Sequence, residues 1–380
     1  MYLETLHLRS FRNYTDQRVT FSAQKTILVG NNAQGKSNAL EAVELLATLK
    51  SHRTSRDRDL VRRDAESGQI RATVARSNGS LELAMTLRGK GRRTLAIEGE
   101  VLRRHLDFLG ALNAVEFSSL DLDLVRGAPE YRRHWLDALL VQIEPIYAYI
   151  LQEYVRVVRQ RNALLKSIRK SLGDGGDATT VPRSDWDQLA LWDAQLAAGG
   201  SRVMRRRDRV LQRLIPLAQR WHDRIGGGTE HLSVIYAPNV ECDRDDPAGV
   251  RAAILEKIKE RRLAEQHLGT SVVGPHRDEI DLQIDDTPAR AYGSQGQQRT
   301  LVLALKLAEL ELIEAVIGEP PLLLLDDVLA ELDPMRQNQL LDAIQDRFQT
   351  LITTTHVDTF DAQWLSASQV LVVEAGRISP

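Results

Sequence analysis

A glycine-rich segment near the N-terminus, GNNAQGKS, has the residue types and the spacing of a phosphate-binding loop. Its glycines allow backbone N–H groups to surround an anion at the start of a helix. Lys36 is expected to reach the terminal phosphates and Ser37 to hold Mg²⁺ through its hydroxyl. The sequence therefore predicts a nucleotide site whose members are Gly30, Asn31, Asn32, Ala33, Gln34, Gly35, Lys36 and Ser37.

Two adjacent carboxylates, Asp326 and Asp327, follow the apolar run Leu322–Leu325. An apolar run that ends in acids places Asp326 at the carboxyl end of a strand, where phosphate-loop folds bind Mg²⁺. Asp327 is then placed to polarise an attacking water. A helix N-cap is the alternative reading of this pair, and the phosphate loop favours the metal.

A third segment, Tyr292–Arg299, combines Ser294, Gly296 and Gln297 just before a helical pattern. A Ser/Gly turn at a helix start caps the helix and can also bind an anion. An ordinary helix start is the alternative.

The composition describes a folded globular protein. The 380 residues are 43% hydrophobic and 27% charged, which excludes a disordered chain. No apolar run is long enough to span a membrane, and the N-terminus lacks the pattern of a signal peptide. One cysteine, Cys242, excludes a disulfide framework, so we expect a cytoplasmic protein.

Arginine is unusually frequent, although the net charge is only −2. The 50 basic residues include nine lysines, which leaves 41 arginines, and the guanidinium suits phosphodiester partners. Clusters occur at 53–63, 156–170 and 202–213. They predict sequence-neutral DNA binding, with a solvated face paired to nearby acids as the alternative. The candidates are Arg53, Arg205, Arg206, Arg207 and Arg209.

Periodicity predicts strands and helices that alternate at both ends of the chain, with a helical middle. Strands are expected at 2–8, 19–21, 26–29, 70–76, 81–88, 94–98, 232–236, 280–284, 321–325, 351–354 and 369–373. Helices are expected at 37–49, 130–171 with a kink at Pro145, 186–225, 250–268, 295–317 and 334–348, with a polar loop at 173–184. This pattern predicts an α/β protein with a mixed, largely parallel sheet and an inserted, mainly helical lobe of short coiled-coil-like helices.

The order of these motifs resembles the ABC-type ATPases and, among them, the RecF family of recombinational repair proteins. The likeness lies in FRNY (11–14), GNNAQGKSN (30–38), Arg53-Thr54, GPHRD (274–278), YGSQGQQR (292–299) and LLLLDDVLAELD (322–333). It implies an ABC-type ATPase head at 1–115 and 269–380, with the helical lobe at 116–268. It also implies a signature motif at Ser294–Gln297, a D-loop ending at Asp333 and a switch histidine at His356. Arg12, Asn13, Asn38 and Gln295 join the implied nucleotide-binding set.

The resemblance further implies an ATP-dependent homodimer that binds duplex DNA beside single-strand gaps. Such a protein would act with RecR and RecO, support RecA loading in recombinational repair, replication restart and the SOS response, and hydrolyse ATP slowly. Two features depart from the general ABC pattern: Asp327 stands where most members have glutamate, and no glutamine is found near Phe117, where the Q-loop is expected.

Two other classes of protein share the phosphate loop. A small-molecule P-loop kinase does not need Ser294–Gln297 or Asp333, and a transporter or another SMC-like ATPase differs in its spacing. Lys36 and Ser294 are 258 positions apart, which is long for a transporter ATPase and short for the arms of chromosome-maintenance proteins.

Overall fold

The computed structural model describes residues 1–380 except 174–179, 345–346, 358–359 and 361. Its central sheet has six strands in the order β15-β14-β3-β13-β12-β8. The four strands from β14 to β12 and the edge strand β8 run parallel, and only β15 is antiparallel. The strands are β3 (Lys25–Val29), β8 (Ala114–Phe117), β12 (Leu322–Asp326), β13 (Thr350–Thr354), β14 (Ser368–Glu374) and β15 (Arg377–Ser379). The predicted largely parallel sheet is therefore confirmed.

Both faces of the central sheet are covered. Side chains alternate between the two faces of a strand, so Leu322 and Leu324 enter one apolar core while Leu323 and Leu325 enter the other. Because both faces of this central strand are buried, its sequence is an uninterrupted apolar run.

One core lies between the central sheet and a second, antiparallel sheet of order β2-β1-β4-β5-β6-β7. The helix α1 (Lys36–Thr48) packs in this core, with buried side chains such as Leu40 and Leu45. The strands are β1 (Tyr2–Phe11), β2 (Tyr14–Thr20), β4 (Ser67–Arg76), β5 (Gly79–Arg88), β6 (Thr94–Ile97) and β7 (Glu100–Val101). The structure thus places the glycine-rich loop and its helix between two sheets.

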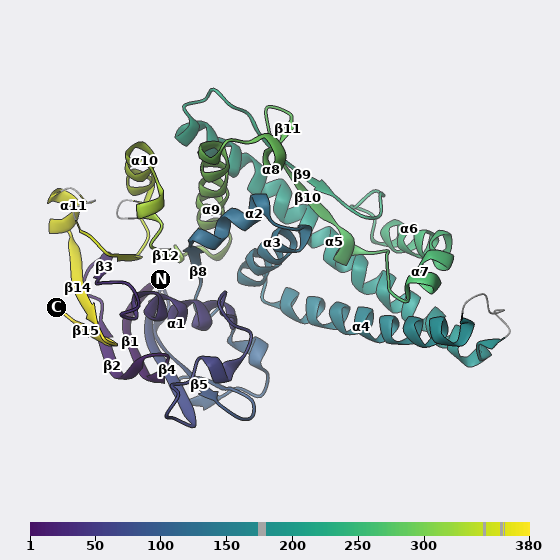
Figure 1. Cartoon of the computed structure of the whole chain (residues 1–380), viewed down its shortest axis with the longest axis horizontal. Coiled ribbons are helices and arrows are strands. Elements are labelled where there is room, and N and C mark those ends of the chain that lie inside the picture. Colours follow the sequence, from purple (N-terminus) through teal and green to yellow (C-terminus); the bar gives the residue numbers. More distant parts are fainter. Residues whose placement is uncertain (174–179, 345–346, 358–359, 361) are drawn as a thin grey trace.

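The other core joins the central sheet to the helices. Helix α3 (Pro129–Ile143) is followed by α4 (Ile146–Leu172), and α5 (Arg183–Gly226) packs against both α4 and α9 (Gln295–Ile317). Figure 1 shows α4 and α5 side by side, extending away from the sheets. Pro145 ends one helix and begins another rather than kinking a single one, because its ring leaves no N–H for the helical ladder.

A small third sheet and several short helices complete the molecule. The predicted helix 250–268 is two helices, α6 (Pro247–Glu260) and α7 (Arg262–Leu268), and six residues of the predicted loop 173–184 lie outside the described residues. The other elements are α2 (Asp123–Arg126), β9 (Leu232–Ala237), β10 (Glu279–Ile284), β11 (Thr287–Pro288), α8 (Ala289–Tyr292), α10 (Pro334–Ile344) and α11 (Ala362–Ser366). Short 3₁₀ turns occur at 57–59, 105–108, 119–122, 275–277 and 329–331.

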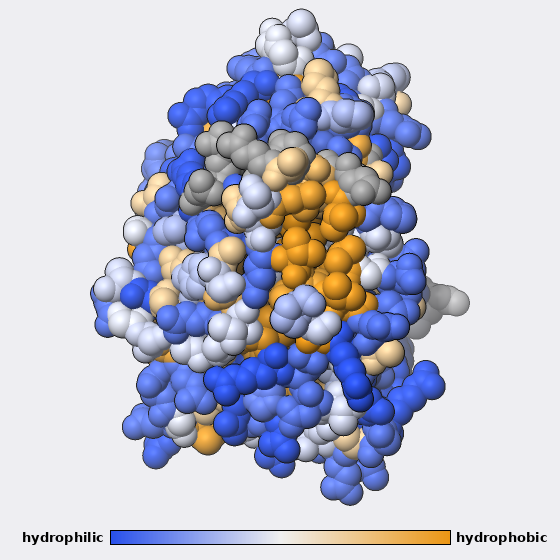
Figure 2. Space-filling view, turned by 90° about the vertical axis from the view of Figure 1, so that its left-hand side faces the viewer, coloured by the Kyte–Doolittle hydropathy of each residue, from blue (hydrophilic) through white to orange (hydrophobic). Residues whose placement is uncertain are grey.

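The end of the molecule that carries α11 and β14 has an apolar surface patch surrounded by hydrophilic residues (Figure 2). Val370 and Val372 of β14 are exposed apolar side chains. None of the helices in the described part of the chain has the length and apolar character needed to cross a membrane.

Candidate functional site

The glycine-rich loop joins the end of β3 to the start of α1. Gly35 has a φ of +119°, and a Cβ there would lie 2.6 Å from Asn13 Nδ2. A Cβ on Gly30 would lie 2.3 Å from the main-chain oxygen of Val373, so both positions need glycine. Lys36 is buried, and its Nζ donates to the main-chain oxygens of Gly30 (2.8 Å) and Asn31 (3.1 Å). The ammonium group therefore lies inside the ring of the loop, as a phosphate-binding lysine must.

Side chains from the N-terminal hairpin hold the loop in shape. Asn13 Nδ2 donates to the main-chain oxygen of Gln34 (2.7 Å), and Asn38 Nδ2 donates to Asn13 Oδ1 (2.8 Å). The hydroxyl of Tyr14 donates to the main-chain oxygen of Gly35 (2.9 Å). Of the two asparagines that the resemblance placed in the nucleotide set, Asn13 thus contacts the loop itself and Asn38 holds the Asn13 side chain.

The paired acids lie at the same edge of the sheet as the loop, because β12, β13 and β3 are parallel neighbours. Asp326 Oδ1 accepts a hydrogen bond from Thr353 Oγ1 (2.7 Å), which in turn accepts one from the main-chain N–H of Asp327 (2.9 Å). Burial raises the pKa of Asp327. The positive charge of Lys36 lowers this pKa, and the negative charge of Asp326 raises it further. Lys36, Asp326 and Asp327 therefore form one electrostatic unit.

His356 follows β13 at this edge and is exposed. Its main-chain N–H donates to Thr354 Oγ1 (3.2 Å), and that hydroxyl donates to the main-chain oxygen of His356 (2.8 Å). These two bonds fix the backbone beyond the strand, and the imidazole is left accessible to a ligand.

Ser294 is the N-cap of α9. Its Oγ accepts from the main-chain N–H of Gln297 (3.2 Å), and Gln297 Oε1 accepts from the main-chain N–H of Ser294 (2.7 Å), which is a capping box. Ser294 and Gln295 are exposed, and a Cβ on Gly296 would lie 3.2 Å from Arg336. The segment is thus an exposed helix start, where the helix dipole suits an anion.

Arg336 connects this segment to Asp333. Its Nε donates to Thr300 Oγ1 (2.8 Å) in α9, and its other nitrogens pair with the Asp333 carboxylate. This hydrogen bond lowers the pKa of Asp333, which is exposed. Among the described residues, no hydrogen bond or ion pair joins Ser294–Gln297 or Asp333 to the phosphate loop. One chain therefore holds two separate halves of the predicted nucleotide site.

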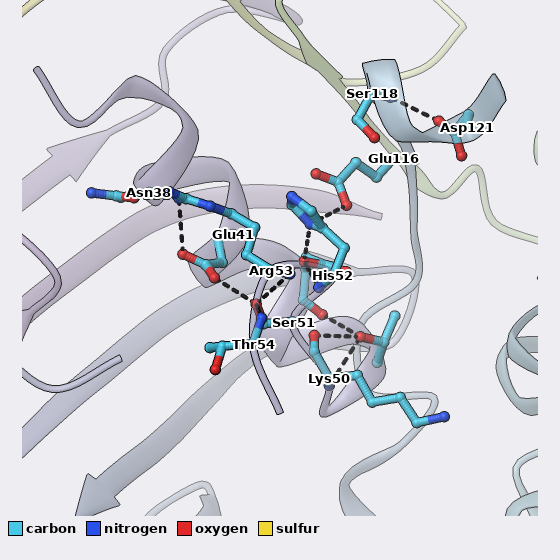
Figure 3. Close-up of polar contacts among 12 residues, drawn as sticks. Asn38, Glu41, Lys50, Ser51, His52, Arg53, Thr54, Glu116, Ser118 and Asp121 are labelled. Carbon is cyan, nitrogen blue, oxygen red and sulfur yellow. Dashed lines mark hydrogen bonds and ion pairs between the residues drawn. The ribbon is translucent and has the colours of Figure 1, made fainter. Parts of the chain in front are cut away.

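Glu41 of α1 binds Arg12, which was predicted for the nucleotide site, and Arg53, which was predicted for DNA. The fully buried Glu41 accepts two hydrogen bonds from Arg12 (2.5 and 2.8 Å), and Arg53 donates to Asn38 Oδ1 (2.6 Å) and Glu41 (3.4 Å). Figure 3 shows Arg53 extending toward Asn38 from the segment that follows α1. Arg53 thus lies one hydrogen bond from the phosphate-loop helix.

Comparison with known proteins decides the family. A family model described as RecF/RecN/SMC N terminal domain matches residues 2–378. The DNA replication and repair protein RecF of Rippkaea orientalis is 66% identical over 380 residues, which cover 100% of both chains. The chain belongs to the RecF family. RecF of Gloeothece citriformis is also 66% identical, over 100% of this chain and 99% of the relative.

Solved structures give the same result for the fold. A structure of the recombination mediator protein RecF with ATP, from the RecFOR pathway, is similar with a TM-score of 0.88 and 30% identity, covering 100% of this chain and 97% of the other. An SMC head domain from Pyrococcus furiosus has a TM-score of 0.56 and 16% identity, over 100% of this chain and 95% of the other. The fold of this RecF-family chain is therefore the ABC-type ATPase fold.

The predicted DNA-contacting arginines of α5 have different surroundings in this RecF-family chain. Arg207 is buried, its guanidinium pairs with Asp137 (2.8 Å), and it donates to the main-chain oxygen of Pro275 (2.7 Å). The prediction that Arg207 contacts DNA is wrong, because its guanidinium is buried and bonded to groups inside the protein. Arg206 pairs with Glu144 (2.9 Å), Arg205 donates to a main-chain oxygen, and Arg209 is exposed.

A basic hollow of about 1290 Å³ lies between the antiparallel sheet and α4, and the sequence interpretation missed most of it. Among the described residues that line it, Asp57 is the one acid. The hollow collects arginines from segments that periodicity assigned to ordinary strands and turns, so their convergence could not be read from the sequence. Its basic residues are Lys50, Arg56, Arg58, Arg88, Arg92, Arg93, Arg103, Arg104 and Arg159.

Proposed function

We propose that this protein is an ATP-dependent, DNA-binding switch of recombinational repair, whose two ATP sites form between two copies of the chain. The observation that carries this proposal is that no hydrogen bond or ion pair among the described residues joins the phosphate loop to Ser294–Gln297, so a second copy would supply the missing helix start. The similar RecF structure that contains ATP supports ATP as the nucleotide. In a twofold dimer, Lys36 of one copy would face Ser294 of the other.

The residues of the loop and of β12 fit a nucleotide with Mg²⁺. The Ser37 hydroxyl and the Asp326 carboxylate offer the hard oxygen ligands that this cation prefers, and the bound ion would neutralise phosphate charge. Lys36 would exchange its bonds to Gly30 and Asn31 for bonds to the terminal phosphates. Asp327 would accept a proton from the attacking water, with His356 at the terminal phosphate.

The γ-phosphate is the element of control in this proposal. It adds negative charge that the starts of α1 and α9 from opposite copies would share, so ATP favours pairing and hydrolysis removes the attraction. Asp327 is one methylene shorter than glutamate, which supports slow hydrolysis and a switch rather than a motor.

The basic hollow is the surface that we propose for DNA. Nine lysines and arginines with one acid provide the charge that a phosphate backbone attracts, without any sequence preference. Arg92, Arg103 and Arg159 are exposed, and no ion pair is described for them in the part of the chain that the structure covers. We further propose that the DNA is a duplex beside a single-strand gap and that RecR, RecO and RecA are the partners. The protein would then also act in replication restart and the SOS response. The division of the chain into an ATPase head (1–115 and 269–380) and a helical lobe (116–268) stays a prediction. So does the cytoplasmic location.

Sedimentation tests the pairing. Wild-type protein should sediment as a dimer with ATP and as a monomer with ADP. Ser294→Arg places a bulky cation at the helix start and should bind ATP as a monomer without pairing. Ser184→Arg, an exposed serine at the start of α5, is the matched control and should pair normally. ATP-independent sedimentation of wild type, or normal pairing of Ser294→Arg, would overturn the shared site.

Salt-dependent retention of duplex DNA tests the hollow. Arg92→Ala with Arg103→Ala should weaken binding and reduce the slope of log affinity against log salt by roughly 2, about one for each phosphate contact removed. Arg251→Ala, an exposed arginine of α6, is the control and should leave the slope unchanged. Equal slopes for all three proteins would place the DNA elsewhere.

A further inference from the structure

Three side chains outside the nucleotide site converge on one point. Glu44 comes from α1, His52 from the segment after α1, and Glu116 from β8, as Figure 3 shows for the latter two. His52 Nδ1 lies 2.8 Å from Glu44 Oε2 and 3.1 Å from Glu116 Oε2. Their candidate ligand atoms all lie within 4.8 Å of one another. The convergence of three chain segments distinguishes this cluster from neighbouring acids on one surface.

The cluster is more acidic than its protein surroundings can satisfy. The side chains of Glu44 and Glu116 are each 13% exposed and that of His52 is 19% exposed. Glu116 Oε1 is buried and has no hydrogen-bond partner among the described residues. Lys306 donates to the main-chain oxygen of Glu116 (2.7 Å), and its ammonium pairs with Asp121 (2.9 Å). A buried carboxylate oxygen without a partner is costly unless it is paired or binds a metal.

We propose that Glu44, His52 and Glu116 bind one divalent transition-metal ion. One imidazole and two carboxylates are a donor set for ions such as Mn²⁺ and Zn²⁺. Ligands about 2.1 Å from an ion are roughly 3.0 Å apart along an octahedral edge and roughly 3.4 Å apart in a tetrahedron. The separations of 2.8 and 3.1 Å between His52 Nδ1 and the two carboxylates let all three groups approach one ion, for which we take Mn²⁺ as the probe.

The position of the site gives the ion a structural consequence. It would join α1, which begins at the phosphate loop, to β8, which leads into α2. Arg126 of α2 donates to Gln298 Oε1 (2.7 Å) at the start of α9. The bound ion would thus fix the phosphate-loop helix relative to the strand that leads toward the other half-site. Its binding depends on neither ATP nor DNA.

Titration with Mn²⁺ in the absence of nucleotide tests the proposal. The full-length chain carrying Asp326→Asn, which removes the carboxylate of the nucleotide site, should bind one Mn²⁺ per chain by calorimetry. Its electron spin-echo spectrum should show coupling to an imidazole nitrogen. Adding His52→Ala should weaken the affinity at least about tenfold and abolish the nitrogen coupling. Adding His231→Ala, an exposed histidine, should change neither.

A second variant keeps the test decisive if His52→Ala does not fold by circular dichroism. Glu116→Gln removes the carboxylate charge with little change of shape and should also weaken Mn²⁺ binding at least about tenfold. The proposal is overturned if the Asp326→Asn chain does not bind Mn²⁺, or if both ligand variants keep its affinity. His52 would then be held by its ion pairs only. Neither result bears on ATP-dependent pairing, which sedimentation measures separately.

Discussion

Lys36 is the side chain on which the chemistry of the proposed nucleotide site depends most. It lies within the loop, bonded to two main-chain oxygens, and its charge counteracts the rise in the pKa of Asp327. The ammonium is a compact cation with three donors, whereas a guanidinium is planar and larger. The ring of the loop therefore suits lysine and not arginine.

Lys36→Arg should retain weak ATP binding and lose turnover. The guanidinium keeps the positive charge but cannot occupy the position of the ammonium, so stabilisation of the transferred phosphate is lost. We expect kcat to fall by at least about 10²-fold in a steady-state phosphate-release assay, with fluorescent ATP binding still measurable. Lys90→Arg on the exposed turn after β5 should behave as wild type. Hydrolysis at the wild-type rate by Lys36→Arg would exclude this role.

His276 should make the fold sensitive to acid. Burial lowers the pKa of His276 from 6.5 to about 4, and its hydrogen bond to the main-chain oxygen of Ser271 (3.2 Å) opposes this only in part. The unfolded chain takes up a proton below pH 6.5 and the folded chain only near pH 4, so stability falls as the pH falls through this window. From pH 7 to pH 5 the loss is about 2 kcal/mol for this group.

Urea unfolding at pH 7 and pH 5 measures this effect. His276→Asn has no titrating ring, so its free energy of unfolding should fall by about 2 kcal/mol less than that of wild type over this interval. His134 and His222, whose pKa values burial also lowers, are present in both proteins and cancel in the difference. An identical pH dependence of the two proteins would contradict the assignment.

Residue types and spacing were sufficient to predict the phosphate loop and the pair Asp326-Asp327. These motifs lie in consecutive positions, and their chemistry is fixed by local geometry. The fate of Arg207 could not be predicted in the same way, because its partner Asp137 is 70 positions away. The role of Glu41 could not be predicted either, because Glu41 binds Arg12 and Arg53 from different segments.

Helices α4 and α5 are held together by a buried ionic network. Arg161 of α4 is fully buried and donates to Asp193 of α5 (2.8 Å), to Glu265 of α7 (3.0 Å) and to Ser271 Oγ (2.7 Å). Its neighbours Arg156 and Arg159 are exposed on the same helix. The arginine-rich stretch of α4 therefore has one structural face and one face open to solvent.

Arg161→Ala should destabilise the fold by about 3–5 kcal/mol, because Glu265 would remain charged and buried without its partner. Arg156→Ala is the control on the same helix. It breaks only an exposed pair with Glu153 and should cost less than about 1 kcal/mol. Free energies of unfolding from urea titrations measure both. Equal stability of the two variants would refute the structural role of Arg161.

The helices and strands show what periodicity can and cannot determine. Helix α9 has the predicted bounds, because a serine cap and an apolar pattern mark its start and length. Strand β8 was missed, because its four residues carry too little pattern to identify them. The break at Arg261 was missed because the helical pattern continues across it, so the interruption depends on packing rather than on sequence.

At the scale of the whole molecule, no hydrogen bond or ion pair among the described residues joins the two half-sites. The phosphate loop, Asp326 and Asp327 lie at one edge of the central sheet, whereas Ser294 and Asp333 are joined to each other through Arg336. The fold class and the family could be predicted from the motif order, and the resemblance already implied an ATP-dependent pair of chains. A second copy is the simplest source of the missing half, given the symmetry that such dimers share.

Mixing two inactive variants measures the shared site most directly. Lys36→Ala lacks a working phosphate loop and Ser294→Arg lacks a working helix start, so each alone should not hydrolyse ATP. In the mixture, the loop of one variant meets the helix start of the other. Because neither variant pairs with itself through ATP, every pair in an equal mixture holds one intact site of two, which predicts about half of the wild-type rate at protein concentrations that saturate pairing. A mixture no more active than its two components would show that the site does not form between chains.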